Sequence, residues 1–242
     1  MKRQIVLDTE TTGLKVSDGA RVIEIGCIEL IDMVKTGNTY RVLINPECPI
    51  PKFLTETIHG ISDEMVKDAP KFKDVAEEFI KFVKGAELII HNAKFDIDML
   101  NMELEKVDKG RLWDHVSNVI CTLELDKRLF AEERKHKLDA ICDRLGIDRS
   151  HRTLHGALID CDLLADVYIK INQMFPKEEI EADLEQTNWV RPEVKRYSIT
   201  LPSAKLSAEE EQAHTDFLTE LVEKDKVQPV FNKVATLKPQ LA

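Results

Sequence analysis

The stretch Ile5-Val6-Leu7-Asp8-Thr9-Glu10 decides how the rest of the chain is interpreted. Its unbroken apolar run predicts a strand that is covered on both faces of a sheet. Because side chains alternate along a strand, Asp8 and Glu10 are expected to point to one side and Thr9 to the other. Two carboxylates at the end of a buried strand repel each other, and a divalent cation with oxygen ligands would relieve that repulsion. The alternative at this point is a strand that simply ends in polar residues.

The composition of the 242-residue chain is that of a globular protein, with 43% hydrophobic and 32% charged residues. No apolar run reaches the ~18–20 residues of a membrane span, and residues 1–4 leave no room for a signal peptide, so a cytoplasmic protein is expected. Five scattered cysteines without a C-x-x-C pair are typical of buried thiols in a reducing compartment. The net charge of −10 disfavours nucleic acid as a partner, but a site that meets phosphate through cations can differ in sign from the whole protein.

The order of the expected elements predicts an α/β domain over residues 1–174, with a mixed five-stranded sheet flanked by helices. Short connections between the first three strands favour an antiparallel meander, and the later strands alternate with helices. The expected strands are residues 3–8, 22–31, 40–44, 88–90 and 119–121. The expected helices are residues 72–84, 93–105, 138–145 and 156–174, with a helical turn at 55–60.

The remainder of the chain has a different character. Residues 175–206 are charged and interrupted by proline, which predicts a flexible linker. In the tail, residues 207–242, Ser207-Ala208-Glu209-Glu210 is a capping box that starts an amphipathic helix running to about Lys224. Its apolar face has no domain of its own to bury against.

Asp96 and Asp160 are two further candidate ligands. Asp96 lies in the first turns of a helix with apolar neighbours three and four residues on, so it is expected to point inward, whereas Asp98 is expected to be solvated. Asp160 lies at the edge of the buried stripe of the last helix, and His155 at the start of that helix would reach over the same site. Taken alone, an acid in a first helical turn is usually explained by the helix dipole, and a lone histidine is more often structural.

Three segments, in this order, resemble the three exonuclease motifs of the D-E-D-D-h family, whose members share the ribonuclease H-like fold. They are Leu7-Asp8-Thr9-Glu10-Thr11-Thr12-Gly13, His91-Asn92-Ala93-Lys94-Phe95-Asp96 and His155-Gly156-Ala157-Leu158-Ile159-Asp160. Within this family the chain is more closely similar to the proofreading subunits of bacterial replicative DNA polymerases. That similarity is carried by Ile58-His59-Gly60-Ile61, by residues 85–93 and 152–158, and by the linker and late helix of the tail.

The resemblance implies a 3′–5′ exonuclease that removes mispaired nucleotides from DNA 3′ ends and releases 5′-nucleotides. It implies two Mg²⁺ or Mn²⁺ ions, with His155 as the general base that deprotonates water. The implied metal ligands are Asp8, Glu10, Asp96 and Asp160. The residues implied to contact the terminal nucleotide are Asp8, Glu10, Thr11, Leu14, Ile58, His59, Asn92 and Asp160.

Partners are implied in the same way. The tail helix would dock on the catalytic (alpha) subunit of the polymerase through Phe217, Leu218 and Leu221, with folding back onto its own domain as the alternative. The peptide from Gln186 to Trp189 resembles Gln-x-x-apolar segments that insert into a sliding clamp, and chance occurrence is the alternative. A small accessory subunit could also bind the catalytic domain.

Two rival functions are compatible with the same motifs. One is a D-E-D-D-h exoribonuclease that acts on RNA 3′ ends, which the long tail disfavours. The other is a polymerase-stabilising scaffold with a vestigial site, which the presence of all four acids and the histidine disfavours.

Overall fold

The computed structural model of the chain describes residues 1–150, 152, 154–176, 180, 212 and 216. The chain divides into two units, Met1–Glu193 and Val194–Ala242, and the fold below is that of the first. No helix in this described part combines the length and the apolar character that a membrane span needs.

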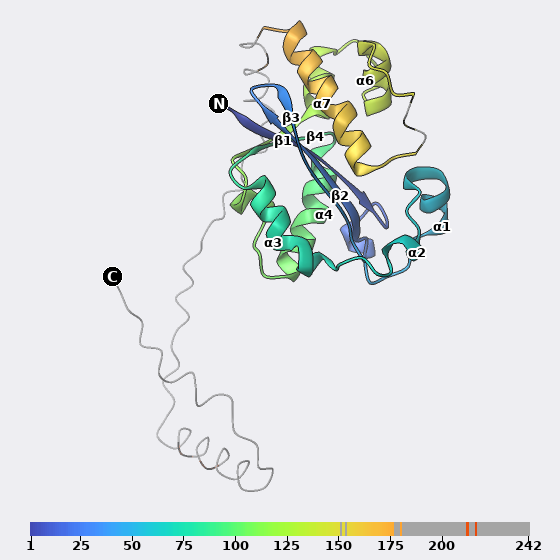
Figure 1. Cartoon of the computed structure of the whole chain (residues 1–242), viewed down its shortest axis with the longest axis vertical. Helices are drawn as coiled ribbons and strands as arrows, with labels where there is room; N and C mark the ends of the chain where they lie inside the picture. The colour runs from blue at the N-terminus through green and yellow to red at the C-terminus, as the bar shows by residue number, and fades with distance from the viewer. Residues whose placement is uncertain (151, 153, 177–179, 181–211, 213–215, 217–242) are drawn as a thin grey trace. The chain divides into compact units, whose positions relative to one another are not determined.

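Strand β1 (Arg3–Thr11) lies at the centre of a five-stranded sheet with the order β3-β2-β1-β4-β5 (Figure 1). On one side it pairs antiparallel with β2 (Val22–Ile31), which pairs antiparallel with β3 (Val34–Leu43). On the other side it pairs parallel with β4 (Glu87–Ile90), which pairs parallel with β5 (Asn118–Cys121). The predicted mixed sheet with an antiparallel meander is therefore confirmed.

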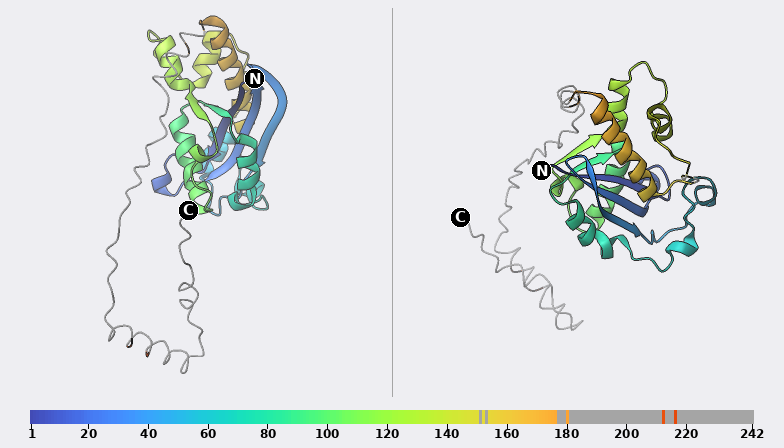
Figure 2. Two further views of the ribbon diagram at one scale, coloured as in Figure 1. Left: turned by 90° about the vertical axis from the view of Figure 1, so that its left-hand side faces the viewer. Right: turned by 45° about the horizontal axis from the view of Figure 1, so that its top comes forward.

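Helices cover both faces of the sheet (Figures 1 and 2). Ile5 and Leu7 face the layer of α3 (Phe72–Val83) and α4 (Ala93–Lys106). Val6 faces the layer of α5 (Thr122–Leu129), α6 (Leu138–Leu145) and α7 (Ala157–Met174). All three side chains are fully buried, as the unbroken apolar run predicted.

The connections carry short helical segments. Gly60 closes one of them in a left-handed conformation at φ 73°, as expected for a glycine after a helical turn. The short segments are η1 (Val16–Asp18), α1 (Lys52–Leu54), the π-helical η2 (Thr55–His59), α2 (Asp63–Val66) and η3 (Leu112–Asp114).

Several element bounds differ from the prediction. Strand β1 continues past residue 8 to Thr11 because its ladder with β2 runs as far as the pair Thr11 and Val22. Strand β3 begins at Val34, six residues earlier than predicted, because Val34 and Lys35 pair with the end of β2. Helix α5 was not predicted at all, because its eight residues carry too few apolar positions for a clear stripe.

Most of the predicted linker and tail lies outside the described residues. This applies to the clamp-like residues Gln186 and Trp189 and to Phe217, Leu218 and Leu221. Within the predicted tail helix, Gln212 and Asp216 are described; both are helical, and Gln212 Nε2 donates to Asp216 Oδ1 at 2.9 Å. The boundaries at residues 174 and 206 stay predictions.

Candidate active site

The carboxyl end of β1 carries the first two candidate ligands. Asp8 and Glu10 share the face of Val6, which is the face that α7 covers. In the register of the sheet, Asp8 lies opposite Gly26 of β2 and Glu10 lies opposite Glu24. Strand β1 has an antiparallel neighbour on one side and a parallel neighbour on the other. The chain runs outward from β1 to β3 and then crosses to β4 on the other side of β1, so the strand order reverses at β1, the place at which open α/β sheets bind ligands.

Asp96 reaches the same place from the other layer. It lies in the first turn of α4, after Asn92 in a left-handed conformation at φ 62°, and is 2% exposed. Thr9 holds it there, because the Thr9 backbone N–H and hydroxyl donate to Asp96 Oδ1 at 3.1 and 2.7 Å. Asp98 is exposed and pairs with Lys94 at 2.5 Å, so the predicted distinction between the two aspartates is confirmed.

Helix α7 supplies the fourth carboxylate in its first turn. Asp160 is buried, and His155, in the segment before the helix, lies with Nδ1 at 3.1 Å from Asp160 Oδ2. One ligand atom from each of Glu10, His155 and Asp160 lies within 4.8 Å of the others, as a shared cation site requires. Sequence elements far apart in the chain are thus brought together as predicted.

Arg152 contacts the candidate site, and the sequence reasoning did not include it among the candidate residues. Its Nε donates to Asp160 Oδ1 at 2.5 Å, and its Nη2 donates to Asp160 Oδ2 at 2.7 Å. The same side chain pairs with Asp139 at 2.5 Å and lies 2.6 Å from His155 Nδ1. The segment 152–158 that carries part of the resemblance begins with this arginine, but its spacing from Asp160 gave no sign of a bidentate contact.

The pKa values of Asp8 and Glu10 on β1 lie above those of isolated carboxylates. Burial, with the charges of Asp96, Asp160 and Glu10, raises the pKa of Asp8 well above its ordinary value. Burial, with the charges of Asp160 and Glu24, raises the pKa of Glu10 to about 8. Without a cation, Glu10 would therefore hold a proton near neutral pH.

The pKa values of Asp96 on α4 and Asp160 on α7 shift in opposite directions. Burial raises the pKa of Asp96 to about 7, although the hydrogen bonds from Thr9 act against it. Burial also acts to raise the pKa of Asp160, but hydrogen bonds from His155 and Arg152 outweigh it and leave that pKa lowered. Asp160 is therefore the member of the cluster that stays ionised most readily.

The candidate nucleotide contacts surround this cluster in part. Ile58 accepts the His155 backbone N–H at 2.8 Å through its carbonyl, which places the η2 turn beside the histidine. His59 is buried, and its Nε2 has no hydrogen-bond partner among the described residues. Thr11 closes β1, with its hydroxyl donating to the Gly13 carbonyl at 2.7 Å. Leu14 is 80% exposed, and Asn92 is also exposed.

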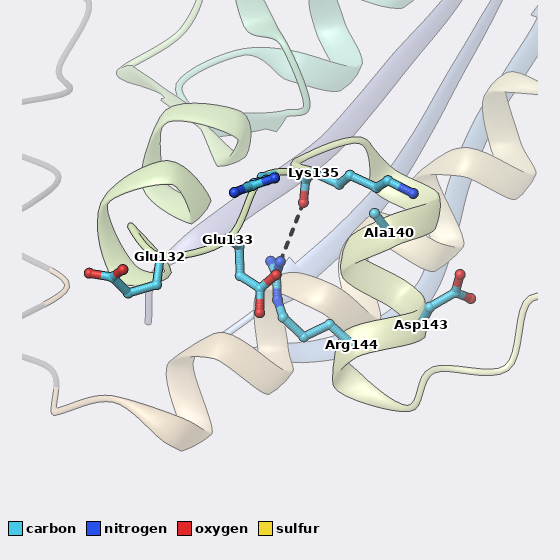
Figure 3. Close-up of a pocket in the computed structure, with 7 residues that line it drawn as sticks. Glu132, Glu133, Lys135, Ala140, Asp143 and Arg144 are labelled. Carbon is cyan, nitrogen blue, oxygen red and sulfur yellow. Dashed lines mark hydrogen bonds between the residues drawn. The ribbon is translucent and has the colours of Figure 1, made fainter.

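A separate surface pocket of about 530 Å³ lies between the loop after α5 and helix α6 (Figure 3). Arg144 donates to the Lys135 carbonyl at 3.4 Å across it. Its lining mixes acidic and basic side chains, and none of the described candidate site residues contributes to it. The candidate active site is therefore defined by the carboxylate cluster and not by this pocket.

Comparison with known proteins places the chain among nucleases. The model of the RNase_T family, described as an exonuclease family, matches residues 5–168. DNA polymerase III subunit epsilon of Pasteurella multocida (strain Pm70) is 40% identical over 232 residues, covering 93% of this chain and 91% of the relative. The subunit of the same name from Rickettsia felis is 40% identical over 228 residues, covering 91% of this chain and 97% of the relative.

Solved structures show the same fold. Exonuclease X in complex with 5′-overhanging duplex DNA is similar with a TM-score of 0.55 and 25% identity, covering 74% of this chain and 98% of that one. The nuclease domain of 3'hExo, a DEDDh family member bound to rAMP, has a TM-score of 0.62 and 19% identity, covering 72% of this chain and 92% of that one. The ribonuclease H-like exonuclease fold is therefore confirmed.

Proposed function

The chain belongs to the exonuclease family, among the epsilon subunits of DNA polymerase III, and from this premise we propose how its residues carry out proofreading. The protein is a 3′–5′ exonuclease that removes mispaired nucleotides from DNA 3′ ends as a subunit of the replicative polymerase. The observation that carries the proposed site is the convergence of Asp8, Glu10, Asp96 and Asp160 beside His155.

The donor set fits divalent cations of the hard type. Exonucleases of this family depend on divalent metal ions. The four side chains offer only carboxylate oxygens, the ligands that Mg²⁺ and Mn²⁺ prefer. Their burial and mutual repulsion raise the pKa values of Asp8 and Glu10, which bound cations would reverse. Two such ions, when bound, would orient water and stabilise the charge on the attacking and leaving oxygens.

His155 is assigned as the general base. For Nε2 to accept the proton of the attacking water, Nδ1 must carry the other ring proton and donate it to Asp160 Oδ2, 3.1 Å away. This requires Arg152 Nη2, a donor that lies 2.6 Å from Nδ1, to move away from the ring. The side chain is half-exposed, which leaves room for substrate beside it. The carboxylate of Asp160 would then stabilise the imidazolium that forms.

The terminal nucleotide would be held by the residues around the cluster. His59 offers a buried Nε2 that lacks a partner in the described part of the chain, and Ile58 is tied to His155 through its backbone. Thr11, Leu14 and Asn92 complete the proposed contacts, of which Leu14 presents an exposed apolar side chain to a base.

The partners follow from the family. The chain associates with DNA polymerase III and with DNA, and we place it with the replisome in the cytoplasm. We further assign the 207–242 tail to the catalytic (alpha) subunit through Phe217, Leu218 and Leu221. Gln186 and Trp189 in the 175–206 linker are assigned to the sliding clamp, and the 1–174 exonuclease domain to a small accessory subunit.

Digestion of end-labelled primer-templates tests this function. We expect Mg²⁺-dependent release of 5′-deoxynucleotides from the 3′ end, faster from a mispaired end than from a paired one, and no release in EDTA. RNA primers of the same sequence serve as the comparison. Faster digestion of RNA than of DNA would favour the exoribonuclease alternative, and hydrolysis in EDTA would refute the metal mechanism.

A further inference from the structure

Glu24 of β2 is a buried carboxylate outside the four candidate ligands. It is 1% exposed and lies directly opposite Glu10 in the antiparallel register of β1 and β2. Directly opposed residues of an antiparallel pair point to the same face, so Glu24 points with Glu10 towards the layer that contains α7. Another acid beside a carboxylate cluster is electrostatically unfavourable unless it has a partner of its own.

The partner of Glu24 is the beginning of helix α7. Glu24 Oε2 accepts the backbone N–H of Ala157, the first residue of the helix, at 2.9 Å. The N-cap position itself is Gly156, which has no side chain that could accept such a bond. The first N–H groups of a helix lack partners within it and form the positive end of its dipole, so a carboxylate from β2 is a fitting cap. Glu24 Oε1 accepts from Arg41 Nε at 2.7 Å, which fixes the orientation of the carboxylate.

Gly26, two residues further along β2, holds the same helical turn against the strand. A Cβ atom at Gly26 would lie 2.4 Å from the backbone carbon of Ala157, so a larger residue would displace the helix. The Cys161 thiol donates to the Gly26 carbonyl at 3.2 Å, one residue after Asp160. The turn that carries Asp160 is therefore attached to β2 on both sides of its carboxylate.

The register connects this attachment to the ligands on β1. Asp8 lies opposite Gly26 and Glu10 lies opposite Glu24, so a shift of α7 along β2 would move Asp160 relative to both carboxylates of β1. We propose that Glu24 is a positioning residue, which caps α7 and thereby fixes Asp160 at the distance from Asp8 and Glu10 that shared divalent cations require. The inference rests on the proposed function, since it concerns the same metal site.

Glu24→Gln and Glu24→Asp in the full-length protein separate the hydrogen bond from the charge. Glutamine keeps the length and one oxygen that can accept the Ala157 N–H, while Arg41, whose side chain is 56% exposed, can turn from the new amide NH2 to water. Aspartate keeps the charge but is one methylene too short. In Mn²⁺ titrations followed by electron paramagnetic resonance without DNA, we expect the dissociation constant to stay within about threefold of the parent for glutamine and to rise at least about tenfold for aspartate. With Mg²⁺, kcat should fall little for Glu24→Gln and strongly for Glu24→Asp, while the KM for DNA stays unchanged for both.

Glu29 provides the matched control on the same strand. It is also a buried carboxylate and pairs with an arginine, Arg3, at 2.7 Å, while its other hydrogen bonds go to Thr36 and Asn38 of β3. Glu29→Asp should lower Tm much as Glu24→Asp does and leave Mn²⁺ binding within about twofold of the parent.

The outcomes distinguish the positioning role of Glu24 from the existence of the metal site. If Glu24→Asp binds Mn²⁺ as well as Glu29→Asp does, or if Glu24→Gln weakens binding as much as Glu24→Asp, the positioning role is refuted while the metal site stands. A parent protein that binds no Mn²⁺ would refute the metal site itself, and this inference with it.

Discussion

Replacing Glu10 by glutamine should abolish catalysis and yet stabilise the metal-free protein. The pKa of Glu10 is raised from its ordinary value of 4.5 to about 8, because the side chain is buried among other carboxylates. Its native form is therefore protonated at pH 7, whereas its unfolded form is ionised. At pH 7, which is about 2.5 units above the pKa of the unfolded side chain, folding must bind a proton that the unfolded chain lacks. This lowers the free energy of unfolding by about 3 kcal/mol. Glutamine has the shape of the protonated side chain and needs no proton.

The effect should depend on pH with a defined sign. Because the folded pKa of Glu10 lies above the unfolded one, its favourable contribution is complete below pH 4.5 and is lost as pH rises through about 8. The advantage of Glu10→Gln should thus be small near pH 4.5 and grow towards pH 8. In EDTA at pH 7 we expect a gain of up to about 3 kcal/mol, or about 6–12 °C in Tm for a chain of this size.

Thermal unfolding in EDTA and in saturating Mg²⁺ measures this directly. With Mg²⁺ the order should reverse, because the cation binds the folded parent more tightly than the variant. Glu29→Gln is the control with the opposite sign, since hydrogen bonds from Arg3, Thr36 and Asn38 outweigh burial and leave the pKa of Glu29 lowered. A Glu10→Gln protein that is no more stable than the parent in EDTA at pH 7–8 would refute the electrostatic reasoning.

Further predictions concern the other assigned residues. Asp8→Ala or Asp160→Ala should lower hydrolysis at least about 10³-fold while circular dichroism stays native, and near-normal activity of either would overturn the two-metal assignment. His155→Ala should lower kcat about 10²–10⁴-fold with little change in Mn²⁺ affinity, so a ligand-like weakening of binding would remove its role as base. The double variant Gln186→Ala, Trp189→Ala should lose binding to the sliding clamp in surface plasmon resonance, and unchanged binding would dismiss that motif.

Local patterns in the sequence account for much of the fold and for each candidate ligand. The apolar run before Asp8 predicted a strand buried on both faces, and the period of a helix distinguished Asp96 from Asp98. These inferences work because alternation along a strand and periodicity along a helix depend only on neighbouring residues. Strand and helix ends were less accurate, as β3 illustrates, because its first residues are exposed and are paired only through the ladder with β2.

Contacts between distant residues could not be predicted in this way. Thr9 holds Asp96 from 87 residues away, and Glu24 caps α7 from 133 residues away. Neither contact leaves a periodic or compositional sign, because each partner looks locally like an ordinary polar residue in a strand or helix. The contact between Arg152 and Asp160 likewise depends on how the chain folds at the start of α7, so the sequence did not indicate it.

The position and number of bound metal ions test the central claim most directly. Crystals soaked with Mn²⁺ and a 5′-mononucleotide should show two anomalous scattering peaks, ~3.5–4 Å apart. Both peaks should lie at the carboxyl end of β1 and be coordinated by oxygens of Asp8, Glu10, Asp96 and Asp160. Peaks elsewhere on the molecule, or an Mn²⁺ ion that the carboxylates of β1 do not contact, would contradict the account.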